Sequence, residues 1–257
     1  MQIHIDSHNG NRMQSKKVSF TILQVTALSL ALSIHMNAYA GLFGGGDSWK
    51  EEVLLHDGSK LIVERSVSRG GRHEIGQSPP ISEQSLRFTI PNTDERVMWK
   101  DEFSKDVGSA NFLPIQLDVL NNLAYLTATP AGCLSYNKWN RPNPPYVVFH
   151  YKNKEWKRIA LQDLPSQFKV PNLIISSPDT AVKKTGQRLI SAEMIREINS
   201  SAKQSEFKEI VREPVSGWAS STSCENMIYY KCGWISPEGT FGRSFMDRTC
   251  EAGTSGH

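Results

Sequence analysis

Short segments that alternate apolar and polar residues, paired across turn-forming sequences, recur along residues 51–160. The clearest turn is His56-Asp57-Gly58-Ser59, because Asp-Gly readily adopts the positive φ angles of a tight β-hairpin. Alternation such as Leu86/Phe88/Ile90 places apolar side chains on one face of a sheet. The pattern predicts four hairpins, with paired strands at residues 51–55 and 60–66, 86–90 and 96–100, 115–120 and 123–129, and 146–151 and 155–160.

Four hairpins amount to eight antiparallel strands, which predicts a mainly β fold, either an antiparallel sandwich or a partly closed barrel. Trp99 and Trp156 both fall in the second strand of their hairpins, but no motif recurs at a fixed offset. A partial β-propeller is therefore the weaker alternative. A short apolar run at residues 173–175 predicts one further strand, which Ser177-Pro178-Asp179 should end.

The composition changes after residue 178. Apolar residues from Met194 to Val211 follow helical spacing, which predicts one helix, or two short ones broken near Ser200-Ser201. Beyond Gly217 the chain is rich in aromatic residues, Gly and Cys, which predicts a disulfide-stapled hairpin with a frayed end. We therefore expect a targeting segment (1–40), an antiparallel β domain (41–178), and a helical and Cys-rich C-terminal segment (179–257) packed on that domain.

Residues 1–40 have the pattern of a secretory signal peptide. Lys16 and Lys17 precede a mostly apolar run at residues 18–34, and Ala38-Tyr39-Ala40 carries the small side chains that signal peptidase accepts. The run is short for a spanning helix and contains Ser, Thr and Gln, which disfavours an uncleaved anchor and a buried core helix. We expect cleavage before Gly41, a periplasmic or secreted protein, and no stable membrane insertion afterwards.

All four cysteines, Cys133, Cys224, Cys232 and Cys250, follow that segment. An even number of cysteines in an exported chain predicts disulfide bonds, with three pairings open. If every thiol is paired, one of the three C-terminal cysteines must bond to Cys133 and tie the tail to the main domain. There is no Cys-x-x-Cys pair and no histidine cluster, which disfavours a zinc site, so we expect no metal and no cofactor.

Charge and motifs exclude several function classes. The excess of 29 Lys and Arg over 26 Asp and Glu comes largely from the first 40 residues, so no basic stripe favours a nucleic-acid partner. The G-x-S-x-G, HExxH, Walker and dinucleotide motifs are missing. His56 falls in a turn, which leaves His73 and His150 as the plausible general bases, and His150 is expected on a solvent face. We assign no catalytic residue.

A glycine-rich loop from Arg69 to Gln77 is the first candidate binding surface. Gly70 and Gly71 allow backbone N–H groups to turn inward while Arg69 and Arg72 add positive charge, as in an anion-binding nest. His73 belongs to the same loop. The simpler alternative is a plain connector between hairpins.

A proline-rich segment at residues 137–146 is the second candidate surface. Trp139 and Tyr146 flank it, with Arg141 between them, and flat rings beside amide and cationic groups suit stacking on a sugar or capture of a peptide. Alternatively, the prolines stiffen a loop and Trp139 closes the open end of the core.

Several segments resemble uncharacterised exported proteins of proteobacteria. Besides the signal, they are Trp49-Lys50-Glu51-Glu52-Val53-Leu54-Leu55-His56-Asp57-Gly58, Gly71-Arg72-His73-Glu74-Ile75-Gly76-Gln77, Pro130-Ala131-Gly132-Cys133, Lys138-Trp139 and Pro142-Asn143-Pro144-Pro145-Tyr146. The resemblance covers roughly residues 49–178. It implies a periplasmic location and no particular activity.

Two functions from different classes remain. We favour an exported, non-catalytic envelope protein that binds a protein, a glycan or another surface component through loop aromatics. The alternative is a periplasmic hydrolase that uses a carboxylate pair, since such pairs leave no short motif; Asp101, Glu102 and Asp106 are candidates. The residues predicted to bind are Arg69, Arg72, His73, Trp139, Arg141 and Tyr146.

Overall fold

The structure, a computed structural model, describes residues 46–216 and 223–252; the predicted signal segment and its cleavage site lie outside them. The strands are β1 (Asp47–Leu54), β2 (Lys60–Arg69), β3 (Ile81–Thr89), β4 (Arg96–Asp101), β5 (Phe112–Leu120), β6 (Leu123–Pro130), β7 (Val147–Lys152), β8 (Glu155–Ile159), β9 (Leu189–Ile190), β10 (Ile228–Tyr230) and β11 (Gly233–Ile235). The helices are α2 (Gly132–Lys138), α3 (Pro178–Thr185), α4 (Ala192–Asn199) and α5 (Thr240–Ala252), with short 3-10 helices η1 (Leu161–Asp163) and η2 (Ser205–Phe207).

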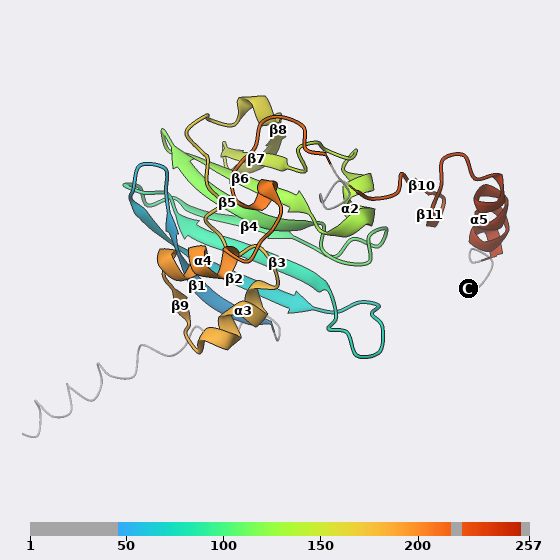
Figure 1. Cartoon of the computed structure of the whole chain (residues 1–257), viewed down its shortest axis with the longest axis horizontal. Coiled ribbons are helices and arrows are strands. Elements are labelled where there is room, and N and C mark those ends of the chain that lie inside the picture. Colours follow the sequence, from blue (N-terminus) through green and yellow to red (C-terminus); the bar gives the residue numbers. More distant parts are fainter. Residues whose placement is uncertain (1–45, 217–222, 253–257) are drawn as a thin grey trace, which may run out of the picture. The chain divides into compact units, whose positions relative to one another are not determined.

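The strands form three sheets (Figure 1). A five-stranded sheet has the order β4-β3-β2-β1-β9, a four-stranded sheet the order β5-β6-β7-β8, and β10 and β11 form a two-stranded hairpin. Neighbouring strands are antiparallel except for the parallel pair of β1 and β9. Neither large sheet closes into a barrel within the described ranges, so the predicted mainly β fold is confirmed in its sandwich form.

All four predicted hairpins are present, and their turns show why the sequence specifies them. Gly58 has a φ of 83° in the first turn. The pairs Asn121-Asn122 and Asn153-Lys154 all have positive φ, between 50° and 63°. Two consecutive residues of positive φ are what a two-residue hairpin turn of the right twist requires, and Asn tolerates that conformation.

The two large sheets pack face to face through one apolar core. Its members from the five-stranded sheet include Val53, Val63 and Leu86, and those from the four-stranded sheet include Leu117 and Leu126. All five are completely buried. They alternate with exposed or half-buried neighbours on β1, β2 and β3, as a strand with one face on a core requires.

The second face of the four-stranded sheet is covered as well. Ile115 and Val148 from the sheet, and Tyr146 just before β7, pack there against side chains of two non-strand segments, which include Phe168 and Ile210. The strand predicted at residues 173–175 is wrong: this segment is coil, although Leu173 and Ile174 are completely buried. Its backbone follows the edge of β5 and bonds to the Ile115 carbonyl instead of extending a sheet.

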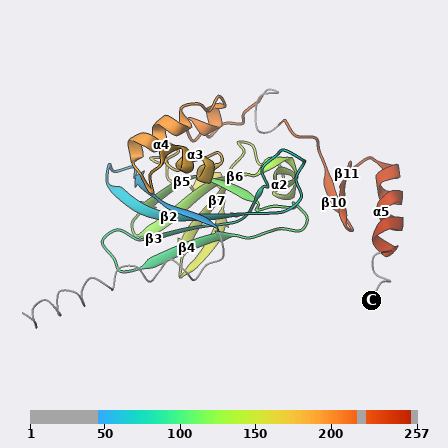
Figure 2. The ribbon, with the colours of Figure 1, turned by 90° about the horizontal axis from the view of Figure 1, so that it is seen from below.

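Helices α3 and α4 cover the end of the five-stranded sheet near β1 and β9 (Figures 1 and 2). The Ser177-Pro178-Asp179 sequence, which was expected to end the run at residues 173–175, also begins α3, with Pro178 at the first helical position. The predicted C-terminal helical region is two short elements: α4, whose N-cap Ser191 accepts a bond from Met194 N–H, and η2. The alternative of two pieces broken near Ser200 is therefore the one observed.

The C-terminal segment is held by two disulfides. Cys133 bonds to Cys224, and Cys232 bonds to Cys250. One tail cysteine thus pairs with Cys133, as expected, and the predicted hairpin is β10-β11. Helix α5 was not predicted and packs on this hairpin, where Gly242 lies against Ile235. In the described ranges, no helix is both long and apolar enough to cross a membrane.

Candidate functional site

An aromatic hollow of about 440 Å³ lies where the edge strand β4 of one sheet approaches the edge strand β8 of the other. The contact between these edges is direct, because Trp156 Nε1 on β8 donates a hydrogen bond of 2.9 Å to the Met98 carbonyl on β4. We call this feature the aromatic hollow. Six of its lining residues are aromatic: Trp99, Phe103, Phe112, Trp139, Phe149 and Trp156.

The rings divide into a floor and a rim. Trp99, Phe112 and Phe149 are at most 9% exposed and belong to the core between the sheets. Trp139 and Trp156 are half-buried, and Phe103 is 45% exposed. Phe112 holds the set together, with its ring centroid 4.6 Å from that of Trp139 and 5.4 Å from that of Phe149. The rim rings are therefore fixed on a packed base and retain accessible surface.

Two polar atoms of residues that line the hollow have no hydrogen-bond partner among residues 46–216 and 223–252. They are Trp139 Nε1, a donor, and Asn111 Oδ1, an acceptor, and both are buried. Most buried polar groups in proteins are paired, so two unpaired atoms in one small region are unusual. A hydroxyl group both donates and accepts hydrogen bonds, so its chemistry matches either atom.

One side of the hollow is a loop, residues 102–109, which contributes Glu102, Phe103 and Ser104 to the lining. Lys138 Nζ from α2 donates hydrogen bonds to Ser104 Oγ and, at 2.8 Å, to Asp106 Oδ1. Burial raises the pKa of Asp106, but the bonds from Lys138 and Ser104 outweigh it and hold that pKa below its usual range. Lys138 is therefore engaged in an ion pair with Asp106 as well as in its bond to Ser104.

Asp101 and Glu102 are the acidic residues that line the hollow. Asp101 is buried, and it accepts bonds from the backbone N–H groups of Asn111 and Phe112 and from the side chains of Asn111 and Gln84. It fixes the start of β5. Asp118, whose pKa burial raises above its usual range despite its bond to His56, lies elsewhere, on β5 beside the β1-β2 turn.

The structure separates the six predicted binding residues. Trp139 alone lines the hollow. Tyr146 is 4% exposed, and its hydroxyl donates to the carbonyls of Glu206 and Glu209, so it anchors the outer coil layer. Arg141 donates to the carbonyls of Cys224 and Glu225 and thereby holds the C-terminal segment.

The predicted binding residues of the glycine-rich loop also have different surroundings from one another. Arg69 makes a two-pronged ion pair with Asp179, with both N–O distances at 2.7 Å, and is a structural residue. Arg72 and His73 are exposed. The loop does approach the hollow, because a Cβ on Gly71 would lie 3.7 Å from the Phe103 ring and 2.9 Å from the Gly108 carbonyl. Gly71, with a φ of 101°, permits that approach.

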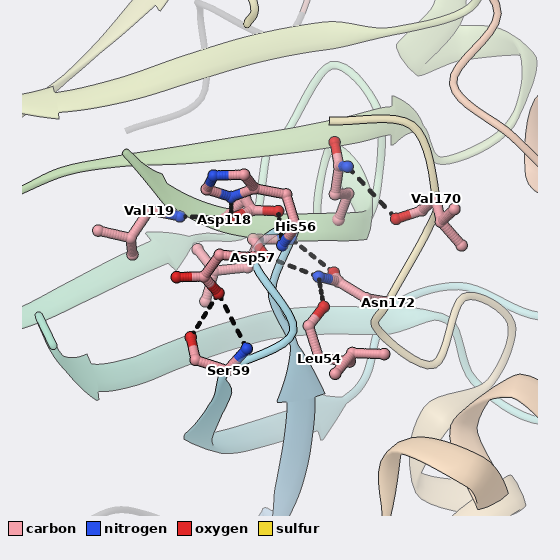
Figure 3. A network of polar contacts seen from close by, with 10 residues as sticks. Leu54, His56, Asp57, Ser59, Asp118, Val119, Val170 and Asn172 are labelled. Atoms are coloured by element: carbon pink, nitrogen blue, oxygen red, sulfur yellow. Dashed lines mark hydrogen bonds and ion pairs between the residues drawn. The ribbon is translucent and has the colours of Figure 1, made fainter. Parts of the chain in front are cut away.

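His56, which the sequence analysis left out as a general base because it falls in a turn, is paired with a carboxylate. Its Nδ1 lies 2.7 Å from Asp118 Oδ1, and its backbone N–H donates to Asp118 Oδ2 (Figure 3). Burial raises the pKa of Asp118, and the bond from His56 opposes that rise only in part. The His56 ring packs on Phe168, at a centroid distance of 5.1 Å.

The surroundings of His56 are those of a structural seam. Next to it, Asn172 Nδ2 donates to the carbonyls of Leu54 and Leu117, while Asn172 Oδ1 accepts from Leu117 N–H (Figure 3). Ser59 donates to Asp57, the neighbour of His56 in the turn, and not to His56. These contacts join the ends of β1 and β5, so the His56 pair closes the sandwich on that side.

No group of His, Cys, Asp or Glu side chains suited to a metal ion occurs in residues 46–216 and 223–252. No protein-family model, no curated protein and no solved structure matches this chain. The function must therefore be argued from the site itself. Trp139 is a predicted binding residue, whereas Trp99 and Trp156, which line the same hollow, are not. The shared position of these two tryptophans in the second strands of their hairpins is the signal that could have pointed to them.

Proposed function

We propose that this protein is a non-catalytic binding protein of the cell envelope and that the aromatic hollow binds a glycan. The observation that carries the proposal is the hollow itself, in which half-buried tryptophans stand on a packed aromatic floor. Its volume of about 440 Å³ falls in the range typical of small-ligand sites. Two disulfides support an extracytoplasmic location, because such bonds persist in oxidising compartments.

A sugar ring fits this chemistry in two ways. Its C–H face is apolar and covers aromatic rings such as Trp156 and Phe103, which removes apolar surface from water. Its hydroxyls provide donors and acceptors for exposed polar side chains of the lining, which include Lys100 and Glu102. Trp156 is held by its bond to Met98, so little ordering of its side chain is needed on binding.

Binding is favoured over hydrolysis by the state of the polar groups. Asp101 is engaged by four donors, and Lys138 is neutralised by Asp106. Glu102 remains as a carboxylate in the lining, and one carboxylate does not supply the acid and base pair of glycoside hydrolysis.

The test is a titration of the purified, disulfide-intact protein with hexasaccharides of N-acetylglucosamine and of glucose, followed by tryptophan fluorescence and calorimetry. Phe103→Ala removes an exposed rim ring and should weaken binding roughly 5- to 30-fold, since burial of an aromatic side chain contributes ~1–2 kcal/mol. Phe241→Ala, which removes an exposed ring from α5, is the matched control and should bind as the parent does.

Two results would contradict the proposal. The first is no binding of either sugar at millimolar concentration, and the second is an equal effect of the Phe103 and Phe241 variants. Release of shorter oligosaccharides during the titration, lost in Glu102→Gln, would instead support the hydrolase alternative.

A further inference from the structure

The C-terminal segment contacts the loop that forms one side of the aromatic hollow. Trp234, on β11, donates a hydrogen bond of 2.5 Å from Nε1 to the Asp106 carbonyl. Asp106 lies in the loop of residues 102–109, whose Phe103 and Ser104 line the hollow. A residue 128 positions away in the sequence therefore holds the backbone of this loop.

Helix α2 connects the same segment to the same loop from the other direction. Cys133 is bonded to Cys224, and Asn137 Nδ2 donates to the Glu225 carbonyl while Asn137 Oδ1 accepts from Met227 N–H. Lys138, the next residue of α2, binds Ser104 and Asp106. One short helix thus carries the covalent anchor of the C-terminal segment and the ion pair that positions the loop.

The hydrogen bonds inside the loop close its base but do not fix its orientation toward the hollow. Ser104 and Ser109 pair as an isolated bridge, and Val107 and Gly108 donate their N–H groups to the Ser104 carbonyl. The Asp106 carbonyl at the tip is bound by Trp234. Among the described residues, the Asp106 backbone carbonyl at the tip is therefore held by the C-terminal segment, and the Asp106 carboxylate is held by Lys138 of α2.

We propose that the C-terminal segment positions one side of the aromatic hollow: the Cys133–Cys224 disulfide holds the segment on α2, and Trp234 acts as a positioning residue that fixes the 102–109 loop. This inference rests on the proposed function, because it gives the segment a role in the affinity of that same hollow. Trp234 need not touch the ligand. Its effect is exerted on Phe103 and Ser104 through the Asp106 backbone.

The test compares Trp234→Phe, which removes the indole N–H and keeps an aromatic ring, with Tyr229→Phe in the same hairpin. Tyr229 is 44% exposed, and its ring packs on Trp234. Hydrogen exchange of the amides of residues 102–109 and the dissociation constant for the N-acetylglucosamine hexamer are measured for each. We expect faster exchange and about 3- to 10-fold weaker binding in Trp234→Phe, the value of one lost hydrogen bond, and no change in Tyr229→Phe.

A second variant keeps the test independent of the Trp234 ring. Cys133→Ser with Cys224→Ser removes the covalent anchor and should raise exchange in the same loop while exchange in β5 and β6 stays slow. Unchanged loop exchange in Trp234→Phe would overturn the inference whatever the ligand. If the parent protein binds no glycan but loop exchange still rises, the proposed function fails while the role of Trp234 in fixing the loop stands.

Discussion

The buried ion pair between Glu51 and Arg65 offers a sharp test of the packing described above. The two side chains are 0% and 2% exposed, with 2.8 Å between Arg65 Nη1 and Glu51 Oε1. Glu51 also accepts bonds from Trp49 Nε1 and Ile174 N–H, and Arg65 donates to the Ile174 carbonyl. The pair therefore joins β1 and β2 to the coil segment at residues 173–175.

Removing one partner should cost far more than an average substitution. Arg65→Met leaves the Glu51 carboxylate buried without its cation and the Ile174 carbonyl without its donor, so we expect a loss of about 3–5 kcal/mol. Glu51→Leu should cost a similar amount, because it leaves the guanidinium uncompensated. Domains of this kind are stable by ~5–15 kcal/mol, so each loss is a large fraction of the total.

The double variant separates charge burial from simple loss of contacts. Glu51→Leu with Arg65→Met removes both charges, which is often neutral or stabilising, but it abandons three polar groups at Trp49 and Ile174. We therefore expect a cost of ~2–4 kcal/mol, no greater than that of either single variant. The coupling between the two sites should then be at least ~3 kcal/mol.

The assay is urea unfolding of the disulfide-intact proteins at neutral pH, with the midpoint and slope fitted separately. Lys50→Met is the matched control on the same strands, because Lys50 and Glu64 pair at 3.3 Å but are 53% and 55% exposed. It should change stability by less than ~1 kcal/mol. The reasoning is refuted if Arg65→Met costs no more than Lys50→Met, or if the two single effects simply add in the double variant.

Three further predictions concern the seams around the sheets. Burial raises the pKa of Asp179, but the bonds from Arg69 outweigh burial and hold this pKa below its usual range. The Asp179 carboxylate therefore stabilises the fold above pH ~4, and this stabilisation is lost as the pH falls through the folded-state pKa. Asp179→Asn should lower the free energy of unfolding by ~1.5–3 kcal/mol at neutral pH and weaken its dependence on pH in the acid range, both measured by urea unfolding. An unchanged dependence on pH would contradict this prediction. Asp118 has the opposite sign: burial raises its pKa despite His56, so the folded protein binds the proton more tightly and stability falls as pH rises from ~4 through the folded-state pKa. Asp118→Asn should remove this fall in stability with rising pH in the same measurement. A fall of the same size in the variant would rule out Asp118 as its cause. Tyr146→Phe should lower the free energy of unfolding by ~1–2 kcal/mol and speed proteolysis near residues 206–211, because the carbonyls of Glu206 and Glu209 lose their donor. A protease-resistant variant would show that other contacts hold the coil layer.

The hairpins could be predicted because their information is local. Residues such as Asn121, Asn122 and Gly58 specify the turns, and alternation specifies the buried face. The coil that covers the outer face of the four-stranded sheet has no such period. Phe168 and Ile210 are buried by long-range packing, which no short window of sequence encodes. Helix α5 was missed because its Gly, Cys and aromatic residues have weak helix propensity.

The site was harder to predict than the fold for a related reason. Residue type alone made Trp139, Arg141 and Tyr146 equal candidates, but their roles depend on what the fold places around them. Tyr146 became a core anchor and Arg141 a clamp on the tail, while Trp139 met Phe112 from a distant strand. His56 shows the converse, since a turn residue gained a buried carboxylate partner from β5.

The arrangement of the disulfides has a consequence for how the chain matures. Each bond includes a cysteine from residue 224 onward, so no disulfide can form before that part of the chain has been synthesised. Eight of the nine strands in the two large sheets, β1 to β8, pair with sequence neighbours, so their hairpin contacts do not depend on a disulfide. Correct pairing of Cys133 requires selection among three cysteines, and the contacts of Asn137 and Arg141 with the backbone of Cys224 and Glu225 favour Cys224.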